Sequence, residues 1–201
     1  MAHKTGLHDR SLVILKADAV QRGLMGEILT RFERKGLKIV AMKMIWPSPE
    51  QSARHYAWDD AQKIKTGTLT IQSYKEKGVI IDKTPLEVGD KVCNMLKAYL
   101  AIGPVVAMII DGAHAIEHIR KLVGSASPLN SDVGSIRADF SMDSYAVADE
   151  GQRATRNLVH ASSSKEEAER EINIWFTESE IYDYELPIEK VLYSKEWEVK
   201  E

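Results

Sequence analysis

Short apolar segments with the composition of strands alternate with segments of helical periodicity along most of the chain, and this alternation limits the fold more than any other feature. The four predicted strands are residues 11–16, 37–46, 105–110 and 157–161. The predicted helices lie between and after them, at residues 18–34, 48–56, 91–100, 115–123 and 165–176. This order predicts an α/β (α+β) fold, a ferredoxin-like βαββαβ arrangement in which helices cover a four-stranded antiparallel sheet.

The residues between these segments predict where helices begin and end. Asp18 is expected to cap the first helix, because a short acceptor side chain satisfies the free N–H groups of a first turn. Gly36 is expected to end the same helix. Ser48 followed by Pro49 predicts the start of the next helix.

One stretch interrupts the alternation. Residues 59–90 are polar and follow neither the helical nor the strand period for long, and they contain Gly67, Gly78, Pro85 and Gly89. We therefore interpret 59–90 as an insertion in a single domain that spans residues 1–201. Residues 177–201 form a C-terminal tail whose aromatic side chains predict packing against another surface; they are Tyr182, Tyr184, Tyr193 and Trp197.

Composition excludes several classes of protein. The 201 residues are 44% hydrophobic and 28% charged, which excludes intrinsic disorder and supplies one packed core. The net charge of −3 provides no global positive field, so we predict no nucleic-acid partner, and the short apolar runs predict no membrane partner. The single cysteine, Cys93, suits a reducing compartment, and we expect a cytoplasmic protein.

Several familiar chemical motifs are missing or have a plainer explanation. The dipeptide Gly-Lys does not occur, which excludes a Walker A loop, and GxGxxG, GxSxG and HExxH are missing too. His114 and His118 have the spacing of metal ligands on a helix, but no third ligand accompanies them, so we predict a solvated helix face and no protein metal site. The serine clusters at 125–131 and 161–164 lack the glycines of a nucleophile elbow and are expected to cap helices.

A histidine and three cations end or flank the predicted strands. His160 ends an apolar strand eleven positions before Glu171 on the following helix. Residue type alone leaves two interpretations of His160 open, a hydrogen-bonded core histidine and a reactive imidazole. Lys16, Arg120 and Arg137 are each compatible with a surface charge. Lys16 and Arg137 nevertheless stand in apolar or structured surroundings, where a charge usually has an anionic partner, and a phosphate group would suit all three cations.

Five longer segments, taken in their order along the chain, form a specific pattern: LKADAVQRGLMGEILTRFERKGLKIVAMKM, HYAW, GPVVAM, GSIRADF and RNLVHASSSKEEAEREINIWF. In these segments the chain resembles the nucleoside diphosphate kinase family. The resemblance covers residues 9–184 and is interrupted after Tyr56 and again between Asp139 and Asn157. Several long motifs in order are much more specific than one short pattern.

The resemblance implies transfer of the γ-phosphoryl group of a nucleoside triphosphate, such as ATP, to a nucleoside diphosphate in two ping-pong steps. It makes His160 the nucleophile, Glu171 the carboxylate that orients the ring, and Ser162 a brace for Glu171. Residues implied at the phosphates or the sugar are Lys16, Arg120, Arg137 and Asn157, with Tyr56 close to them. Lys16 would also stabilise charge on the transferring oxygens, which makes it catalytic. The resemblance further implies Mg²⁺ carried by the nucleotide phosphates, and a homo-oligomer, either a hexamer or a tetramer of dimers.

The chain departs from the family pattern at the expected base and phosphate contacts. Val92 stands where a base-stacking phenylalanine is usual, with Leu96 one helical turn further on, so we expect an aliphatic contact to the base and weak discrimination between bases. Ala126 replaces the usual threonine, and Ser163 replaces the usual aspartate. Ala161 replaces the glycine after the histidine, which requires that the backbone there is not left-handed.

Two other functions fit parts of the sequence. One is a catalytically weakened nucleotide-binding or scaffold protein that keeps the fold but has lost activity through its insertions and loop changes. The other is a regulatory ferredoxin-like sensor of small molecules. The sensor accounts for the fold alone and leaves Lys16, Arg137 and His160 unexplained.

Overall fold

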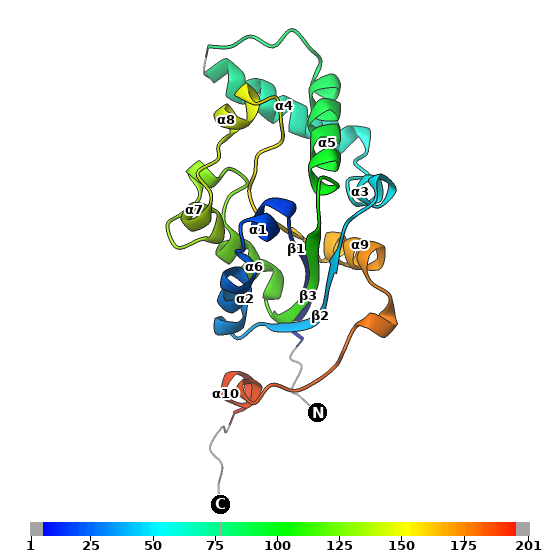
Figure 1. Ribbon diagram of the computed structural model, residues 1–201, viewed down its shortest axis with the longest axis vertical. Helices are drawn as coiled ribbons and strands as arrows, with labels where there is room; N and C mark the ends of the chain where they lie inside the picture. The colour runs from blue at the N-terminus through cyan, green and yellow to red at the C-terminus, as the bar shows by residue number, and fades with distance from the viewer. Residues whose placement is uncertain (1–5, 77, 196–201) are drawn as a thin grey trace, which may run out of the picture. The chain divides into compact units, whose positions relative to one another are not determined.

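The computed structural model describes residues 6–76 and 78–195, which fall into two compact units (Figure 1). We call the first the sheet unit; it comprises residues 1–45, 104–144 and 156–201. The second is the helical unit, residues 46–103 and 145–155. That residues 1–201 form a single domain remains a prediction. Among the described residues, no helix has the length and apolar character needed to cross a bilayer.

The sheet unit is built on a four-stranded antiparallel sheet, which confirms the predicted fold class. The order across the sheet is β2-β3-β1-β4, and the strands are β1 (His8–Leu15), β2 (Lys38–Ile45), β3 (Val105–Ala113) and β4 (Val159–Ala161). β3 is buried over all but its last residue and β1 over its second half, as their continuous apolar and β-branched runs require. Because they stand at the two ends of the strand order, β2 and the short strand β4 are the edges of the sheet.

Helices cover both faces of this sheet. α2 (Met25–Arg34) and α6 (Ala115–Val123) lie on one side, where Phe32 and Ile119 enter the main hydrophobic core, and α9 (Lys165–Trp175) packs against β1 on the other side (Figure 1). Because side chains alternate along a strand, β1 supplies apolar side chains to both layers. Shorter helical elements complete the unit: α1 (Ala17–Gln21), α7 (Ile136–Phe140), α10 (Ile188–Tyr193) and the 3₁₀ turns Pro128–Asn130 and Glu178–Glu180.

The helical segment after β1 differs from its prediction. Lys16 is the N-cap residue of α1, and Asp18 lies inside the first turn, so the prediction that Asp18 caps this helix is wrong. The chain then breaks at Gly23, which has a φ of 69°, before α2 begins at Met25. Gly36 follows the end of α2 with a φ of 86°, a backbone conformation that favours glycine, so the predicted end is confirmed.

The helical unit contains α3 (Pro49–His55), α4 (Asp60–Glu76), α5 (Pro85–Leu100) and α8 (Tyr145–Glu150). Ser48 caps α3 as predicted, its hydroxyl accepting a hydrogen bond from the Gln51 N–H at 3.1 Å. The segment 59–90, which shows no sustained period in the sequence, is largely helical in the structure. This stretch supplies the whole of α4 and the first turn of α5, which begins at Pro85 and not at Lys91.

Gly67 and Gly89 have low helix propensity, yet they allow α4 and α5 to pack closely. A Cβ atom on Gly67 would overlap the backbone carbonyl of Pro85, and one on Gly89 would overlap the carbonyl of Lys63. The two backbones therefore approach so closely that no side chain fits between them at these positions. Local propensity disfavours both glycines, but the tertiary contact requires them.

The segments 59–90 and 140–156 meet in the helical unit. Tyr74 of α4 is hydrogen-bonded to Asp149 of α8. Burial raises the pKa of Tyr74 to about 12, and the bond to Asp149 adds to this effect. Nearby, Lys91 Nζ donates to Gln152 Oε1 at 3.2 Å. The segments 59–90 and 140–156 thus stabilise one another.

The C-terminal tail packs along the sheet unit. The Tyr182 N–H and the Tyr184 hydroxyl each donate to a carbonyl group of β2, at 2.8 and 2.7 Å. Lys38 of β2 and Glu189 of α10 form a buried ion pair, with Nζ and Oε1 2.6 Å apart. Trp197, the last of the aromatic tail residues, lies outside the described residues.

Candidate active site

His160 lies on β4, at the edge of the sheet. The strand pairs with β1 so that His160 is opposite Ile14, a buried residue of the core. The His160 side chain itself is 15% exposed. The ring is therefore held by the core but can still be reached from outside.

A buried carboxylate holds one nitrogen of this ring. His160 Nε2 lies 3.0 Å from Oε2 of Glu171, a residue of α9 that is 1% exposed. The Ser162 hydroxyl donates to the same carboxylate oxygen at 2.7 Å and accepts from the Leu12 N–H at 3.2 Å. Because a carboxylate accepts hydrogen bonds, the proton of the neutral ring lies on Nε2 and the lone pair on Nδ1.

The surroundings of His160 favour the neutral ring. Burial is the largest effect that lowers its pKa, and the positive charges of Lys16, Arg137 and Arg170 lower it further. The carboxylate of Glu167 acts in the opposite direction. At neutral pH the ring therefore keeps the lone pair that a nucleophile needs.

Lys16 lies where β1 ends and α1 begins, and it is 4% exposed. Its Nζ donates to Oδ1 of Asn157 at 2.6 Å. Burial and the charge of Arg137 lower the pKa of Lys16 to about 7, against the opposing effect of Asp18. The structure thus brings two of the predicted site residues, Lys16 and Asn157, into direct contact.

Arg137 is directed at backbone carbonyl groups around the site. Its Nε donates to the carbonyl of Asn157 at 3.0 Å and its Nη2 to that of Val159 at 2.5 Å. Its Nη1 donates to the carbonyls of Gly124 and Ser125, each at 2.9 Å. Arg137 therefore joins the loop after α6 to the segment that leads into His160, and its positive charge lies close enough to lower the pKa of that ring.

Arg120 lies in the last turn of α6 and is exposed. Its carbonyl accepts from the Gly124 N–H at 3.0 Å, and the carbonyl of Gly124 is bonded by Arg137. The Asn157 side chain reaches the same loop, because its Nδ2 donates to the carbonyl of Ala126 at 2.8 Å. The loop at 124–126 thus connects the predicted phosphate-binding residues through its backbone, which makes the identity of side chain 126 less important for this connection.

The other two predicted nucleotide contacts belong to the helical unit. Tyr56 follows α3 and is 7% exposed, and its carbonyl lies 3.4 Å from the Cys93 thiol on α5. Leu96 stands one turn further along α5, and Val92 precedes Cys93; both are partly exposed. Tyr56 and the aliphatic residues of α5 therefore belong to one packed region of this unit.

The backbone conformation next to His160 determines whether alanine fits at position 161. Ala161 lies in β4 with φ outside the left-handed region, so alanine fits there. The left-handed residue is instead Leu158, with a φ of 65°. Ser163, at the usual aspartate position, donates its N–H to Glu167 Oε2 at 2.6 Å and so helps to start α9.

Sequence reasoning missed the role of Asp18. The carboxylate that was expected to cap a helix accepts a hydrogen bond from the N–H of Leu158 at 3.1 Å. Nothing in a sequence pattern marks a leucine with positive φ, because such a conformation is imposed by tertiary contacts. The only available signal was the place of Asp18 two residues after Lys16.

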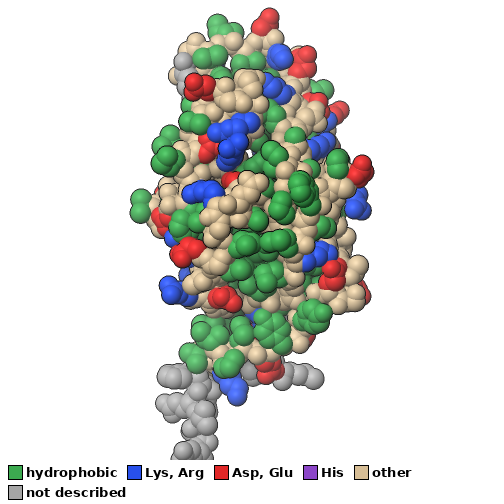
Figure 2. Space-filling model, viewed as in Figure 1, with side chains coloured by type: hydrophobic (Ala, Val, Ile, Leu, Met, Phe, Trp, Pro, Cys, Tyr) green, Lys and Arg blue, Asp and Glu red, His purple; other side chains and the backbone are tan. Residues whose placement is uncertain are grey.

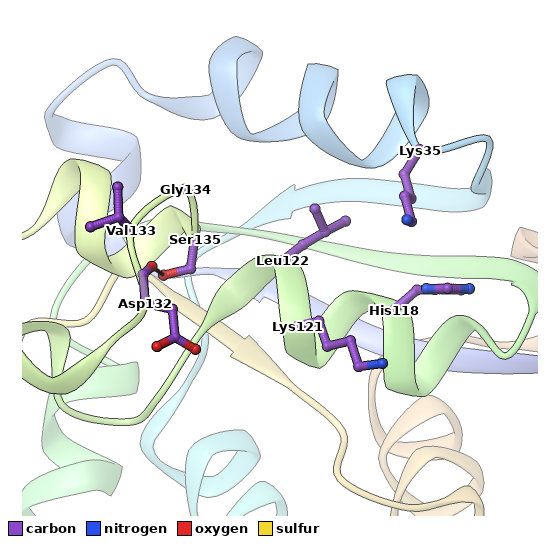
Figure 3. A pocket seen from close by; sticks show the side chains of 8 residues that line it. All are labelled: Lys35, His118, Lys121, Leu122, Asp132, Val133, Gly134 and Ser135. Carbon is purple, nitrogen blue, oxygen red and sulfur yellow. Dashed lines mark hydrogen bonds between the residues drawn. The ribbon is translucent and has the colours of Figure 1, made fainter.

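A hollow of about 280 Å³ lies elsewhere on the sheet unit (Figure 3). Its lining residues differ from the predicted site residues and are Lys35, His118, Lys121, Leu122, Asp132, Val133, Gly134 and Ser135. His114 is exposed, and His118, which lines this hollow, is partly exposed. Burial and the charges of Lys35 and Lys121 lower the pKa of His118.

Comparison with known proteins gives a consistent result. A family model described as nucleoside diphosphate kinase matches residues 9–74 and 87–181. A nucleoside diphosphate kinase of Pyrobaculum aerophilum is 45% identical over 180 residues, which are 87% of this chain and 98% of that protein. One of Pyrococcus abyssi is 43% identical over 176 residues, 88% of this chain and 89% of that protein.

Solved structures agree in fold as well as in sequence. The crystal structure of an NDP kinase from Pyrobaculum aerophilum has a TM-score of 0.84 and 44% identity, covering 88% of this chain and 100% of that chain. A transition-state mimic of the nucleoside-diphosphate kinase from Borrelia burgdorferi, with bound vanadate and ADP, has a TM-score of 0.76 and 32% identity. That match covers 92% of this chain and 96% of the other.

Proposed function

Because the chain belongs to the nucleoside diphosphate kinase family of phosphotransferase enzymes, we propose that His160 carries the phosphoryl group between its two nucleotide substrates. The substrates are nucleoside triphosphates, ATP among them, and nucleoside diphosphates. The observation that supports this role is the chain of hydrogen bonds from Ser162 through Glu171 to His160, with the charges of Lys16 and Arg137 close to the ring.

The reaction consists of two displacements. In the first, Nδ1 of His160 attacks the γ-phosphorus, an N–P bond forms, the bond to the bridging oxygen breaks and a nucleoside diphosphate leaves. In the second, a terminal oxygen of another nucleoside diphosphate attacks the same phosphorus and the N–P bond breaks. The ring gains positive charge while it is phosphorylated, and the Glu171 carboxylate at Nε2 stabilises that charge.

Positive charges held at fixed positions stabilise the phosphoryl group during transfer. Phosphoryl transfer needs positioning and charge stabilisation more than covalent assistance, and Lys16 and Arg137 supply positive charge beside His160. We assign Asn157 to the positioning of Lys16, to which it is bonded. Arg120 binds the phosphates from the end of α6. Tyr56 and Leu96 form the nucleotide-binding contacts in the helical unit, where Leu96 offers an aliphatic surface to the base.

Mg²⁺ enters this scheme as part of the nucleotide substrate. The charged groups of the sheet unit that act on the His160 ring are Lys16, Arg137 and Arg170, opposed by the Glu167 carboxylate, and this excess of cations suits phosphate oxygens and not a bare metal ion. The carboxylate of Glu171 is already bonded to His160 and Ser162. We therefore propose that the nucleotide phosphates hold Mg²⁺, which neutralises part of their charge when bound.

We also propose a homo-oligomer, a hexamer or a tetramer of dimers. The edge strand β2 is bonded by the tail at Ile39 and Val40 but exposes Met42 and Met44 further along, at 55% and 58% exposure. Apolar side chains exposed on an edge strand favour association. Hydrophobic side chains also gather on the surface over α10, where Ile188, Val191 and Leu192 are exposed (Figure 2).

A cytoplasmic location is also part of the proposal. The buried free thiol of Cys93 supports it, because free thiols suit a reducing compartment.

The phosphohistidine is tested by incubation with ATP labelled at the γ-phosphoryl group. We expect a stoichiometric protein label that is stable in base, labile in acid and removed by an excess of any nucleoside diphosphate. Stability in base excludes phosphoserine, which base eliminates. Nucleotide binding without such a label would instead indicate the nucleotide-binding or scaffold function.

The pKa of Lys16 predicts a pH dependence for kcat/KM. The ammonium form stabilises phosphate charge, and a pKa lowered to about 7 means that the free enzyme loses this form as the pH rises through 7. We expect kcat/KM to fall by about tenfold per pH unit above that point. The kcat value should fall only at higher pH, because bound phosphates favour the ammonium. A kcat/KM that is constant from pH 6 to 9 would contradict this role of Lys16.

A further inference from the structure

Asp18 is an acidic residue of the site region to which the mechanism gives no task. It lies in the first turn of α1, two residues after Lys16, and it caps no helix. Its Oδ2 accepts from the Leu158 N–H at 3.1 Å. Its Oδ1 is buried and has no hydrogen-bond partner among the described residues. The residue is partly exposed, but a carboxylate oxygen withdrawn from water is costly unless a specific contact compensates for it, so the contact with Leu158 calls for an explanation.

The partner of Asp18 is a leucine in a strained conformation. Leu158 is fully buried and has a φ of 65°, a backbone conformation that is strained for a residue with a side chain. Both polar groups of Leu158 are held by the start of α1. The Asp18 carboxylate accepts from its N–H, and its carbonyl accepts from the Lys16 N–H at 2.8 Å.

This leucine connects two parts of the site. The residue before it is Asn157, whose side chain accepts from Lys16 Nζ, and β4 with His160 begins directly after it. A change of φ at Leu158 to the extended region would turn the Asn157 side chain away from Lys16 and alter the course of the chain into His160. The contact with Asp18 opposes that change.

We propose that Asp18 is a positioning residue for phosphoryl transfer, whose carboxylate oxygen holds Leu158 in its left-handed conformation and so fixes His160 relative to Lys16. The proposal rests on the proposed roles of His160 and Lys16. It requires a hydrogen-bond acceptor at the place of Asp18 Oδ2, and it does not require a negative charge there.

The test compares three variants with the wild type. In Asp18→Asn the amide oxygen can still accept from Leu158, so we expect kcat within about threefold of wild type. Asp18→Ala removes the acceptor, and Asp18→Glu keeps the charge but moves it by one methylene. For both we expect kcat to fall about 10–100-fold, the usual effect when a supporting contact of a reactive group is lost.

The assays are best made as pH profiles that extend below pH 6. The Asp18 carboxylate raises the pKa of Lys16 in the wild type, so variants without it lose the Lys16 ammonium at a lower pH. The Lys16 ammonium is faced by Arg137, by the His160 ring and by the Asn157 amide as well as by Asp18. Because burial and these cations lower the pKa of His160, its ring remains neutral at pH 6. Values of kcat compared on the low-pH plateau of each profile then differ by geometry and not by protonation.

Glu117→Ala serves as the matched control. Glu117 is an exposed acidic residue in the first turn of α6, so this variant removes a helix N-terminal charge without touching Leu158. We expect it to keep wild-type kcat.

The outcomes separate the two proposals. Equal losses in Asp18→Asn and Asp18→Ala would show an effect of charge and overturn the inference, as would wild-type kcat in all three variants. If Asp18→Ala does not fold, Asp18→Asn against Asp18→Glu decides in the same way. A wild-type protein that takes no label from ATP on His160 would defeat the proposed function, whereas labelled wild type with unaffected Asp18 variants would defeat only the role of Asp18.

Discussion

Replacement of His160 by alanine is expected to lower the exchange of phosphoryl groups between nucleotides by at least about 10³-fold, the scale seen when a covalent nucleophile is removed. The side chain is 15% exposed and lies on a three-residue edge strand, so its loss leaves the core intact. The variant should therefore remain folded. Steady-state exchange from ATP to several nucleoside diphosphates and the γ-label on the protein measure the effect, and both signals should disappear together.

His118→Ala is the control for this experiment. His118 belongs to α6 and lines the hollow outside the site, so its loss removes an imidazole without touching the proposed chemistry. We expect wild-type exchange from it. If His160→Ala retained more than about a tenth of wild-type kcat, the phosphohistidine mechanism would be wrong.

Replacement of Gly67 by alanine is expected to destabilise the helical unit by about 1–3 kcal/mol or more, the usual cost of overpacking. The new methyl group would overlap the backbone carbonyl of Pro85, and neither backbone can rotate away as a side chain would. Alanine favours a helix over glycine by about 1 kcal/mol, which offsets only part of that cost. Urea unfolding followed by circular dichroism measures the free energy of unfolding.

Gly26→Ala is the matched control. Gly26 is also a helical glycine, in α2, but a Cβ there meets nothing within 4 Å. We expect it to be neutral or stabilising by up to about 1 kcal/mol, because only helix propensity changes. A Gly67→Ala variant as stable as Gly26→Ala would show that α4 and α5 do not pack as closely as the structure indicates.

The helix at 115–123 shows how far local signals reach. Its predicted bounds agree with α6, which ends at Gly124 with a φ of 88°. Apolar side chains at helical spacing bury Ile116 and Ile119, and the glycine accepts a conformation that other residues avoid. Periodicity and helix end agree here, so tertiary structure has nothing to correct.

The segment 59–90 shows where local signals mislead. Glycine and proline within a polar stretch normally indicate a loop, yet here Pro85 opens α5 at its first position, with Thr84 as N-cap. Gly67 and Gly89 permit a close contact between two helices. No short window of the sequence contains both glycines and the residues that they face. A reader of the sequence alone cannot know which partner a glycine faces.

The sequence by itself determined the antiparallel sheet, its covering helices and the placement of His160 and Glu171 on adjacent elements, because hydrophobic periodicity and residue order are local properties. Only the tertiary structure decided that Glu171 holds Nε2, that Arg137 binds backbone carbonyls, and that Asp18 holds Leu158. These contacts join residues that are distant in sequence. Their hydrogen bonds and charges form only once the sheet has brought the ends of β1 and β4 together.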